Sequence, residues 1–234
     1  MTLRFAIEVF GYTVGLPLEV LLVAALLRGA YVRFPFVFAY AVASLLAGAV
    51  EFPLYLLGWT DRQSRNLYVR AYWINEQILL GLLYCVVISL VYEATAATRS
   101  RRIVRSAVVA GALLFAAITF AVHFDNKIKF GEWMTPWTRE LNFCAAVLDL
   151  GLWALLIGVR QKDRRLLMLT GALGILFSGE AIGESVRQLA QSAQSRPISL
   201  FGSFVILLAD QIFLYLWWQA FRKAPVRRTT SPAK

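Results

Sequence analysis

The sequence is poor in charge: only 16% of its 234 residues are Asp, Glu, Lys or Arg. A soluble domain carries about 25% charged residues, so this low fraction argues against a surface that faces water. No long polar stretch remains for a separate soluble domain, and we expect one membrane domain. The net charge of +10 would suggest nucleic acid as a partner of a soluble protein. Here the basic residues cluster between apolar runs, which indicates membrane topology and lipid headgroups, and no nucleic acid.

Cysteine and histidine are also scarce. Cys85 and Cys144 lie in separate apolar runs, so the sequence holds neither a disulfide framework nor a zinc-binding pattern. His123 is the single histidine, which excludes most metal and haem chemistry that depends on several histidines. We therefore expect no metal and no cofactor. The acid–base groups are almost all carboxylates, so we expect no catalytic residues and no enzyme.

Long apolar runs are what the sequence has in quantity, because 59% of the residues are hydrophobic. A spanning helix needs about 20 mostly apolar residues, and backbone groups in lipid must be hydrogen-bonded internally, which favours helices. Seven segments qualify: residues 5–27, 34–58, 68–95, 104–124, 137–159, 165–187 and 198–221. The sequence predicts an all-α membrane protein with seven transmembrane helices in residues 1–222. A disordered basic tail is expected at 223–234.

Lys and Arg indicate the orientation, because they concentrate on the cytoplasmic side of a membrane. Fifteen fall on the side of the first, third and fifth loops and the C-terminal tail, and nine on the other side. This bias predicts a multi-pass protein of the cell membrane, with its N-terminus outside and its C-terminus in the cytoplasm. The bilayer is then the main partner. The basic cytoplasmic face would either contact anionic lipids or act only as a topology signal.

Acidic residues inside the apolar runs are the most unusual feature. Ten of the fourteen acids lie within the proposed helices: Glu8, Glu19, Glu51, Glu76, Glu93, Glu140, Asp149, Glu180, Glu184 and Asp210. A charged side chain at the middle of a bilayer costs at least ~2.5–3.5 kcal/mol, so such residues face the interior of a bundle. We expect Glu8, Glu93 and Glu140 to reach the interface, since they lie nearest the ends of their helices.

The deeper acids predict an outward-facing polar chamber. Glu51, Glu76 and Glu180 lie roughly 10–14 Å from the outer ends of their helices, and the chamber is expected to narrow toward Asp149 and Asp210. No Lys or Arg lies deep in any helix, so a proton, a metal ion or an amine would supply the missing positive charge. The expected ligand-binding residues are Glu51, Tyr72, Trp73, Glu76, Gln77, Asp149, Glu180, Glu184, Asp210 and Gln211.

Two kinds of residue refine this prediction. Tyr72 and Trp73 beside Glu76 favour an organic cation, because aromatic faces attract cations. Gly179 and Gly183 form a small-xxx-small pair, which predicts that another helix packs closely there.

The function that these residues favour most is that of a transporter or binding protein for a small solute or cation, with protonation coupled to binding. The alternatives are a sensory or accessory subunit that acts through a partner protein, and a buried polar network that only fixes helix packing.

A weak internal repeat is also present. Residues 76–80 read acid, Gln, Ile, apolar, Leu, and residues 210–214 repeat this order 134 positions later. Similar offsets relate Glu8 to Glu140. The pattern predicts a three-plus-one-plus-three parallel duplication, with the acid-free fourth helix as linker. Glu76 and Gln77 would then face Asp210 and Gln211 across the bundle.

Three resemblances follow from these residues. The pattern Tyr72-Trp73-x-x-Glu76, followed by Tyr92 and Glu93, resembles uncharacterised small seven-helix membrane proteins from bacteria, and this likeness implies no particular activity. The topology alone is similar to SWEET-type transporters and to rhodopsin-like receptors. Rhodopsins need a Schiff-base lysine on the seventh helix, and residues 198–221 contain none.

Overall fold

A computed structural model describes residues 3–58, 62–95, 101–123, 130–158 and 163–222. The predicted tail at 223–234 lies outside the described residues. Within these ranges the chain is entirely helical: α1 (Leu3–Leu27), η1 (Ala30–Val32, a 3-10 turn), α2 (Pro35–Leu57), α3 (Arg62–Ala94), α4 (Arg101–His123), α5 (Phe130–Gly158), α6 (Arg164–Ser192) and α7 (Arg196–Arg222). Six helices, all except α5, are long and apolar enough over their described residues to cross a membrane. The predicted all-α, membrane-type fold is confirmed to this extent.

Three helices extend beyond the predicted spans by five residues or more. α3 begins at Arg62 rather than at residue 68, and α5 begins at Phe130 rather than at residue 137. α6 continues to Ser192 rather than ending at residue 187. Hydropathy marks only the apolar part of a helix, whereas polar turns can continue the same backbone hydrogen bonding into the interface. The 3-10 turn at Ala30–Val32 was also not expected from the sequence.

Local sequence sets several helix ends. α1 ends before Gly29, whose φ of +115° is a conformation that residues with a Cβ rarely adopt. Pro35 occupies the first turn of α2, where its missing N–H needs no partner. At the start of α6, a carboxylate oxygen of Asp163 accepts a hydrogen bond from the backbone N–H of Arg165 at 2.9 Å and caps the helix.

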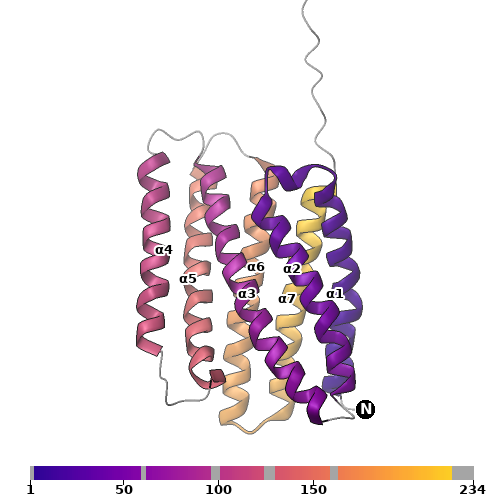
Figure 1. The fold of residues 1–234 in the computed structure, drawn as a ribbon. Coiled ribbons are helices and arrows are strands. Elements are labelled where there is room, and N and C mark those ends of the chain that lie inside the picture. Colours follow the sequence, from indigo (N-terminus) through magenta and orange to yellow (C-terminus); the bar gives the residue numbers. More distant parts are fainter. Residues whose placement is uncertain (1–2, 59–61, 96–100, 124–129, 159–162, 223–234) are drawn as a thin grey trace, which may run out of the picture.

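Six helices close a ring, with α4 outside it (Figure 1). Around the ring α1 packs on α2, α2 on α3, α3 on α5, α5 on α6, α6 on α7, and α7 on α1. α4 packs mainly against α5 and α3. The start of α1 and the end of α7 lie at opposite ends of the bundle (Figure 1), which we call the N-terminal end and the C-terminal end.

The apolar core fills the half of the ring nearer the C-terminal end. Its fully buried side chains come from the later turns of α1, α3 and α7 and the earlier turns of α2 and α6, and include Leu22, Val37, Leu169, Phe213 and Trp217. The Trp217 indole N–H donates a hydrogen bond of 3.2 Å to the Leu169 carbonyl, so the polar atom of this buried ring is satisfied. This half of the molecule is therefore a conventional packed interior.

α6 and α7 approach most closely along a seam of small residues. A Cβ added to Gly179 would lie 2.1 Å from the Cβ of Ala209, and one added to Gly183 would lie 2.8 Å from the Gly202 carbonyl oxygen. No larger side chain fits these positions without a shift of the backbone. The predicted close approach at Gly179 and Gly183 is confirmed, and the neighbouring helix is α7.

Candidate functional site

The other half of the ring, toward the N-terminal end, encloses a cavity of about 540 Å³. Its walls come from one face each of α1, α2, α3 and α7, with Arg187 contributed by α6. On α2 the lining residues are Ser44, Ala47, Gly48 and Glu51, a spacing of three and four that places them on one side of the helix. A second cavity of about 470 Å³ shares Glu8, Tyr68 and Val69 with the first.

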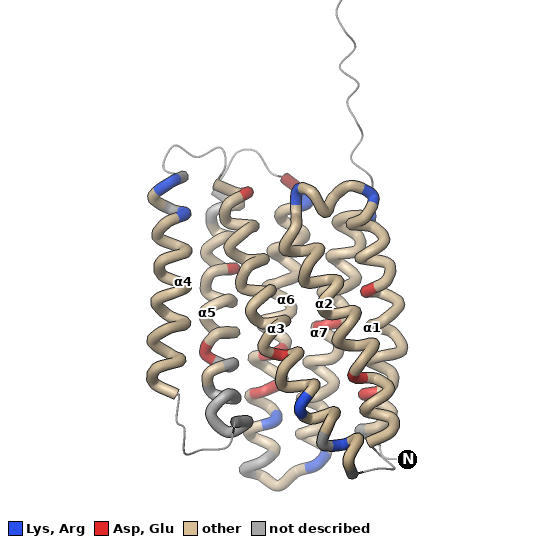
Figure 2. Tube along the Cα trace, in the orientation of Figure 1, with Lys and Arg blue, Asp and Glu red and all other residues tan. Residues whose placement is uncertain are grey.

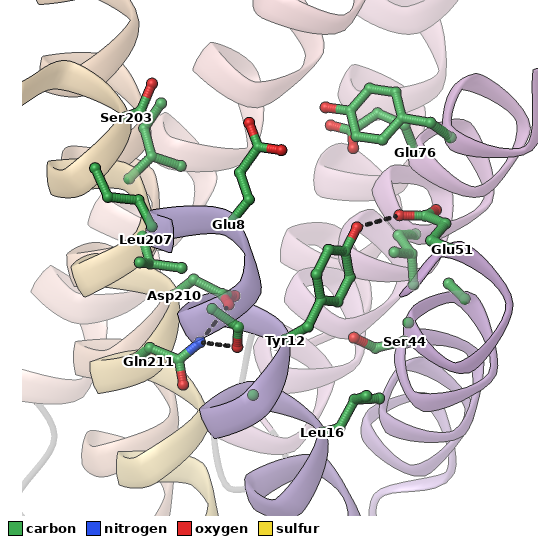
Figure 3. Close-up of a pocket in the computed structure, with 18 of the residues that line it drawn as sticks. Glu8, Tyr12, Leu16, Ser44, Glu51, Glu76, Ser203, Leu207, Asp210 and Gln211 are labelled. Atoms are coloured by element: carbon green, nitrogen blue, oxygen red, sulfur yellow. Dashed lines mark hydrogen bonds between the residues drawn. The ribbon is translucent and has the colours of Figure 1, made fainter. Parts of the chain in front are cut away.

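Five carboxylates line the cavity: Glu8, Glu19, Glu51, Glu76 and Asp210. Two are fixed by donors from neighbouring helices. Glu51, 8% exposed, accepts a hydrogen bond from the Tyr12 hydroxyl at 3.2 Å (Figure 3) and another from the Asn75 amide at 2.8 Å. Glu19 is also 8% exposed and accepts a short hydrogen bond from the Ser44 hydroxyl. Both side chains are therefore oriented before any ligand arrives.

Glu76 and Asp210 are held less tightly than Glu51 and Glu19. Over the described ranges no hydrogen bond reaches the Glu76 carboxylate, and Asp210 receives only a long contact of 3.5 Å from Gln211 (Figure 3). The Gln211 amide also donates to the Gly11 carbonyl at 3.4 Å, while its Oε1 is buried without a donor among these residues. The cavity therefore retains acceptor oxygens that a bound donor could use.

Aromatic side chains form the wall of the cavity beside Glu51 and Glu76. Tyr12, Tyr68, Tyr72 and Trp73 all line it. The ring centroids of Tyr68 and Tyr72 are 6.3 Å apart, and those of Tyr72 and Trp73 are 5.8 Å apart. Carboxylates next to aromatic faces form an environment that suits an organic cation.

Six of the ten residues predicted to bind a ligand line this cavity: Glu51, Tyr72, Trp73, Glu76, Asp210 and Gln211. Gln77 lies outside the lining, so of the expected pair only Glu76 faces Asp210 and Gln211. Glu180 and Glu184 also lie outside the lining. Glu180, on α6, is nevertheless close enough to Glu76 of α3 and Asp210 of α7 for their charges to interact.

Asp149 does not belong to the chamber. It is 3% exposed on α5, and its Oδ2 lies 3.4 Å from the position of a Cβ added to Gly174 of α6. Its Oδ1 has no hydrogen bond within the part of the chain that the structure describes. The expected narrowing of the chamber toward Asp149 is therefore not found, because none of the described residues of α5 lines the cavity. Asp149 is instead a useful internal comparison: a buried acid outside the site.

The cavity also contains residues that sequence reasoning missed. Tyr12, Tyr68, Ser44 and Ser203 line it, and so does Glu19, which was not among the expected ligand-binding residues. On α1 a signal was present. Glu8, Gly11, Tyr12, Gly15 and Glu19 recur at helical spacing and form a stripe of polar and small residues along an otherwise apolar helix.

Positive charge near the cavity is limited to its margin. Among the described residues that line the cavity, Arg187 is the one basic residue, and its guanidinium donates a hydrogen bond of 2.7 Å to Glu184 one turn away. The spacing of three residues places these two side chains on one face of α6. Lys and Arg otherwise lie toward the two ends of the bundle, whereas Asp and Glu also occupy its middle (Figure 2). Within the described part of the chain, Glu19, Glu51, Glu76 and Asp210 therefore have no Lys or Arg as a hydrogen-bond partner.

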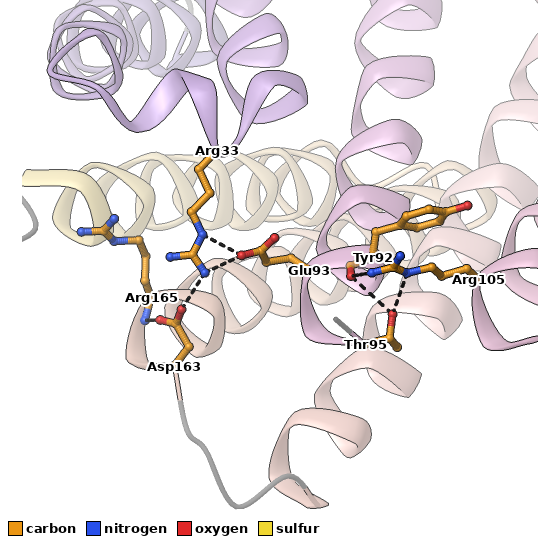
Figure 4. Close-up of polar contacts among 7 residues, drawn as sticks. All are labelled: Arg33, Tyr92, Glu93, Thr95, Arg105, Asp163 and Arg165. Atoms are coloured by element: carbon orange, nitrogen blue, oxygen red, sulfur yellow. Dashed lines mark hydrogen bonds and ion pairs between the residues drawn. The ribbon is translucent and has the colours of Figure 1, made fainter. Parts of the chain in front are cut away.

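Acids near the C-terminal end are paired instead. Arg33, just after η1, contacts Glu93 of α3 at 2.5 Å and Asp163 at the start of α6 at 3.1 Å (Figure 4). Burial lowers the pKa of the Arg33 guanidinium, but the hydrogen bonds and charges of the two acids outweigh it and raise that pKa overall. Arg105 similarly joins α4 to the end of α3, donating to the Tyr92 carbonyl at 2.6 Å.

The three acids expected at the interface have different surroundings. Glu93 is bound by Arg33. Glu140 lies 3.1 Å from His123, which links α5 to α4. Glu8 lies where the two cavities meet. Position along a helix alone therefore does not separate acids that tie helices together from acids that line the cavity.

Among the described residues, no three His, Cys, Asp or Glu side chains converge as metal ligands would. Comparison of the chain with protein-family models, curated proteins and solved structures found no match.

Proposed function

We propose that this chain is a seven-helix protein of the cell membrane that binds a small organic cation in the cavity and transports it. The observation that carries the proposal is the cavity itself: about 540 Å³ with five lining carboxylates, four aromatic rings and one arginine already bound to a carboxylate. Burying the carboxylates of Glu19, Glu51, Glu76 and Asp210 inside the bundle is costly, and a bound cation would offset this cost. The aromatic wall favours an amine over a metal ion.

The proposed orientation places the N-terminus outside, and its support is the bias of Lys and Arg toward the opposite side. The cavity would then open outward, because Ile7 and Glu8 near the start of α1 line it. The basic cytoplasmic face would contact anionic lipids. A parallel duplication of α1–α3 and α5–α7 remains part of the proposal, and the order of helices around the ring is compatible with it.

A receptor or accessory subunit is the second candidate. Its support is the packed core, which ends the cavity at the level of residues such as Tyr40 and Phe213. A receptor needs only a chamber that is closed at its inner end. A transporter must also adopt a second state, in which the chamber opens to the other side of the membrane. In that case the cytoplasmic face would contact a partner protein.

Flux measurements test the proposal. Purified protein in proteoliposomes is expected to take up methylamine, choline or putrescine in a saturable manner, and Glu76→Gln and Asp210→Asn should each abolish uptake. Asp149→Asn is the matched control, since it neutralises a buried acid outside the cavity, and it should retain uptake. Saturable binding lost in Glu76→Gln, but without flux, would favour the receptor. If none of the three amines binds, the acids serve packing alone and the proposal fails.

A further inference from the structure

Glu51 and Glu19 lie at two different levels of the cavity. At the outer level Glu51 is bound by Tyr12 and Asn75, and at the inner level Glu19 is bound by Ser44. Glu51 and Ser44 are seven residues apart on α2, and Tyr12 and Glu19 are seven apart on α1. At 1.5 Å per residue, each helix separates the two levels by about 10 Å along the bundle.

The space between the levels is also polar. Asp210 lines the cavity, and its charge interacts with that of Glu19 on one side and Glu76 on the other. Gln211 is adjacent: its amide reaches the Gly11 carbonyl, and its Oε1 is buried without a donor among the described residues. Acceptors therefore follow one another from Glu51 and Glu76, through Asp210, to Glu19.

The separation of about 10 Å between the two levels favours some classes of ligand over others. A compact monocation would neutralise one level and leave the carboxylate of the other buried without a counter-charge, which is unfavourable. An anion would be repelled by both. A zwitterion would need a free basic partner for its carboxylate, but the Arg187 guanidinium is bound to Glu184. A flexible chain with an ammonium at each end matches both levels, with its methylene groups alongside the aromatic and aliphatic lining.

We propose that the cavity binds a linear polyamine, with one ammonium at Glu51 and Glu76, another at Glu19, and Asp210 with Gln211 between them. This inference rests on the proposed binding of organic cations and specifies its substrate class. It also assigns Glu19 and Ser44 to recognition. Tyr12 orients Glu51, and Ser44 orients Glu19.

The test is a chain-length series measured by calorimetry on the purified full-length protein. The probes are α,ω-diamines from 1,3-diaminopropane to 1,8-diaminooctane, spermidine, monoamines of matched length, and tetramethylammonium. Affinity should rise with diamine length until both levels are reached. A long diamine should bind roughly 100-fold more tightly than the matched monoamine, the lower end of what linking two binding groups provides.

Variants locate the second ammonium. Glu19→Gln should reduce the advantage of the long diamine over the monoamine to a fewfold, whereas Asp149→Asn should leave it intact. A second variant covers the case in which Glu19→Gln does not fold. A Cβ added to Gly48 would lie 3.0 Å from the flexible Leu16 side chain and 3.6 Å from Glu19 Oε2. Gly48→Ala should therefore narrow the inner level and shift the preferred diamine toward shorter chains.

The outcomes separate the two proposals. If diamines and monoamines bind equally and Glu76→Gln still abolishes binding, the polyamine inference is wrong while cation binding stands. An unchanged length preference in both Glu19→Gln and Gly48→Ala would also overturn the inference. If no probe binds, both proposals fail.

Discussion

The two halves of the helix ring along its long axis are built on different principles. Toward the C-terminal end, side chains such as Val37, Phe213 and Trp217 are fully buried, and the acids at that end are bound by Arg33. Toward the N-terminal end, the ring encloses a cavity lined by Glu19, Glu51, Glu76 and Asp210, and Arg187 is the one basic residue in its described lining. Acidic residues therefore form ion pairs in one half of the ring, whereas in the other half they line a cavity that a ligand can enter.

The way α6 and α7 are joined shows how the cavity half can tolerate this. Gly179, Gly183 and Gly202 let the two backbones meet without any contribution from charge. At the other end, the arginine contacts link segments that are far apart in the chain. If cohesion near the cavity comes from backbone packing, its acids are free to serve a ligand. Each prediction below tests that division.

The largest effect is expected from Gly183→Ala. The new Cβ would lie 2.3 Å from Ile206 Cγ1 and 2.8 Å from the Gly202 carbonyl oxygen, so α6 and α7 must separate. Overpacking of this kind costs about 1–3 kcal/mol of unfolding free energy. Thermal unfolding in detergent measures the loss. Gly81→Ala is the control, because a Cβ there meets no heavy atom within 4 Å, and equal stability of both variants would contradict the packing argument.

Sequence reasoning recovers the features that depend on composition along one helix. Apolar runs predict the helices, and the cost of burying charge predicts that Glu51, Glu76 and Asp210 face inward. It fails where the answer depends on how each helix is rotated against its neighbours. Asp149 looks as functional as Asp210 in the sequence, but α5 presents it to α6 instead of to the cavity.

Long-range pairing is likewise invisible in a single sequence. Arg33 contacts acids 60 and 130 positions away, and nothing near Arg33 in the chain selects Glu93 over another acid. Tyr12 was missed for a different reason. Its hydroxyl matters because Glu51 comes within 3.2 Å, and the sequence can place Tyr12 on the polar stripe of α1 but cannot show that Glu51 is its partner.

A smaller effect is expected at the packed end from Arg33→Gln. The substitution removes ion pairs to Glu93 and Asp163 whose side chains are about one third to one half exposed, so the loss should be about 1 kcal/mol. The loss should shrink at 1 M salt, which screens exposed charges, and cation binding in the distant cavity should persist. Arg28→Gln is the matched control, since Arg28 is exposed at the same end. A comparable loss in Arg28→Gln would attribute the effect to general surface charge.

The smallest effect distinguishes the halves by its sign. Without ligand, Glu76→Gln removes a carboxylate that interacts with like charges on Glu51, Glu184 and Asp210, so the variant should be more stable, by about 0.5 kcal/mol, as is common when a residue serves function rather than folding. Glu93→Gln is the same chemical change at the packed end, and there it removes the Arg33 contact and should lower stability by a similar amount. Differential unfolding of the two purified variants against the parent protein measures both signs in one experiment. If both variants were less stable than the parent protein, Glu76 would hold helices together as Glu93 does. The contrast between the two halves of the ring would then not hold.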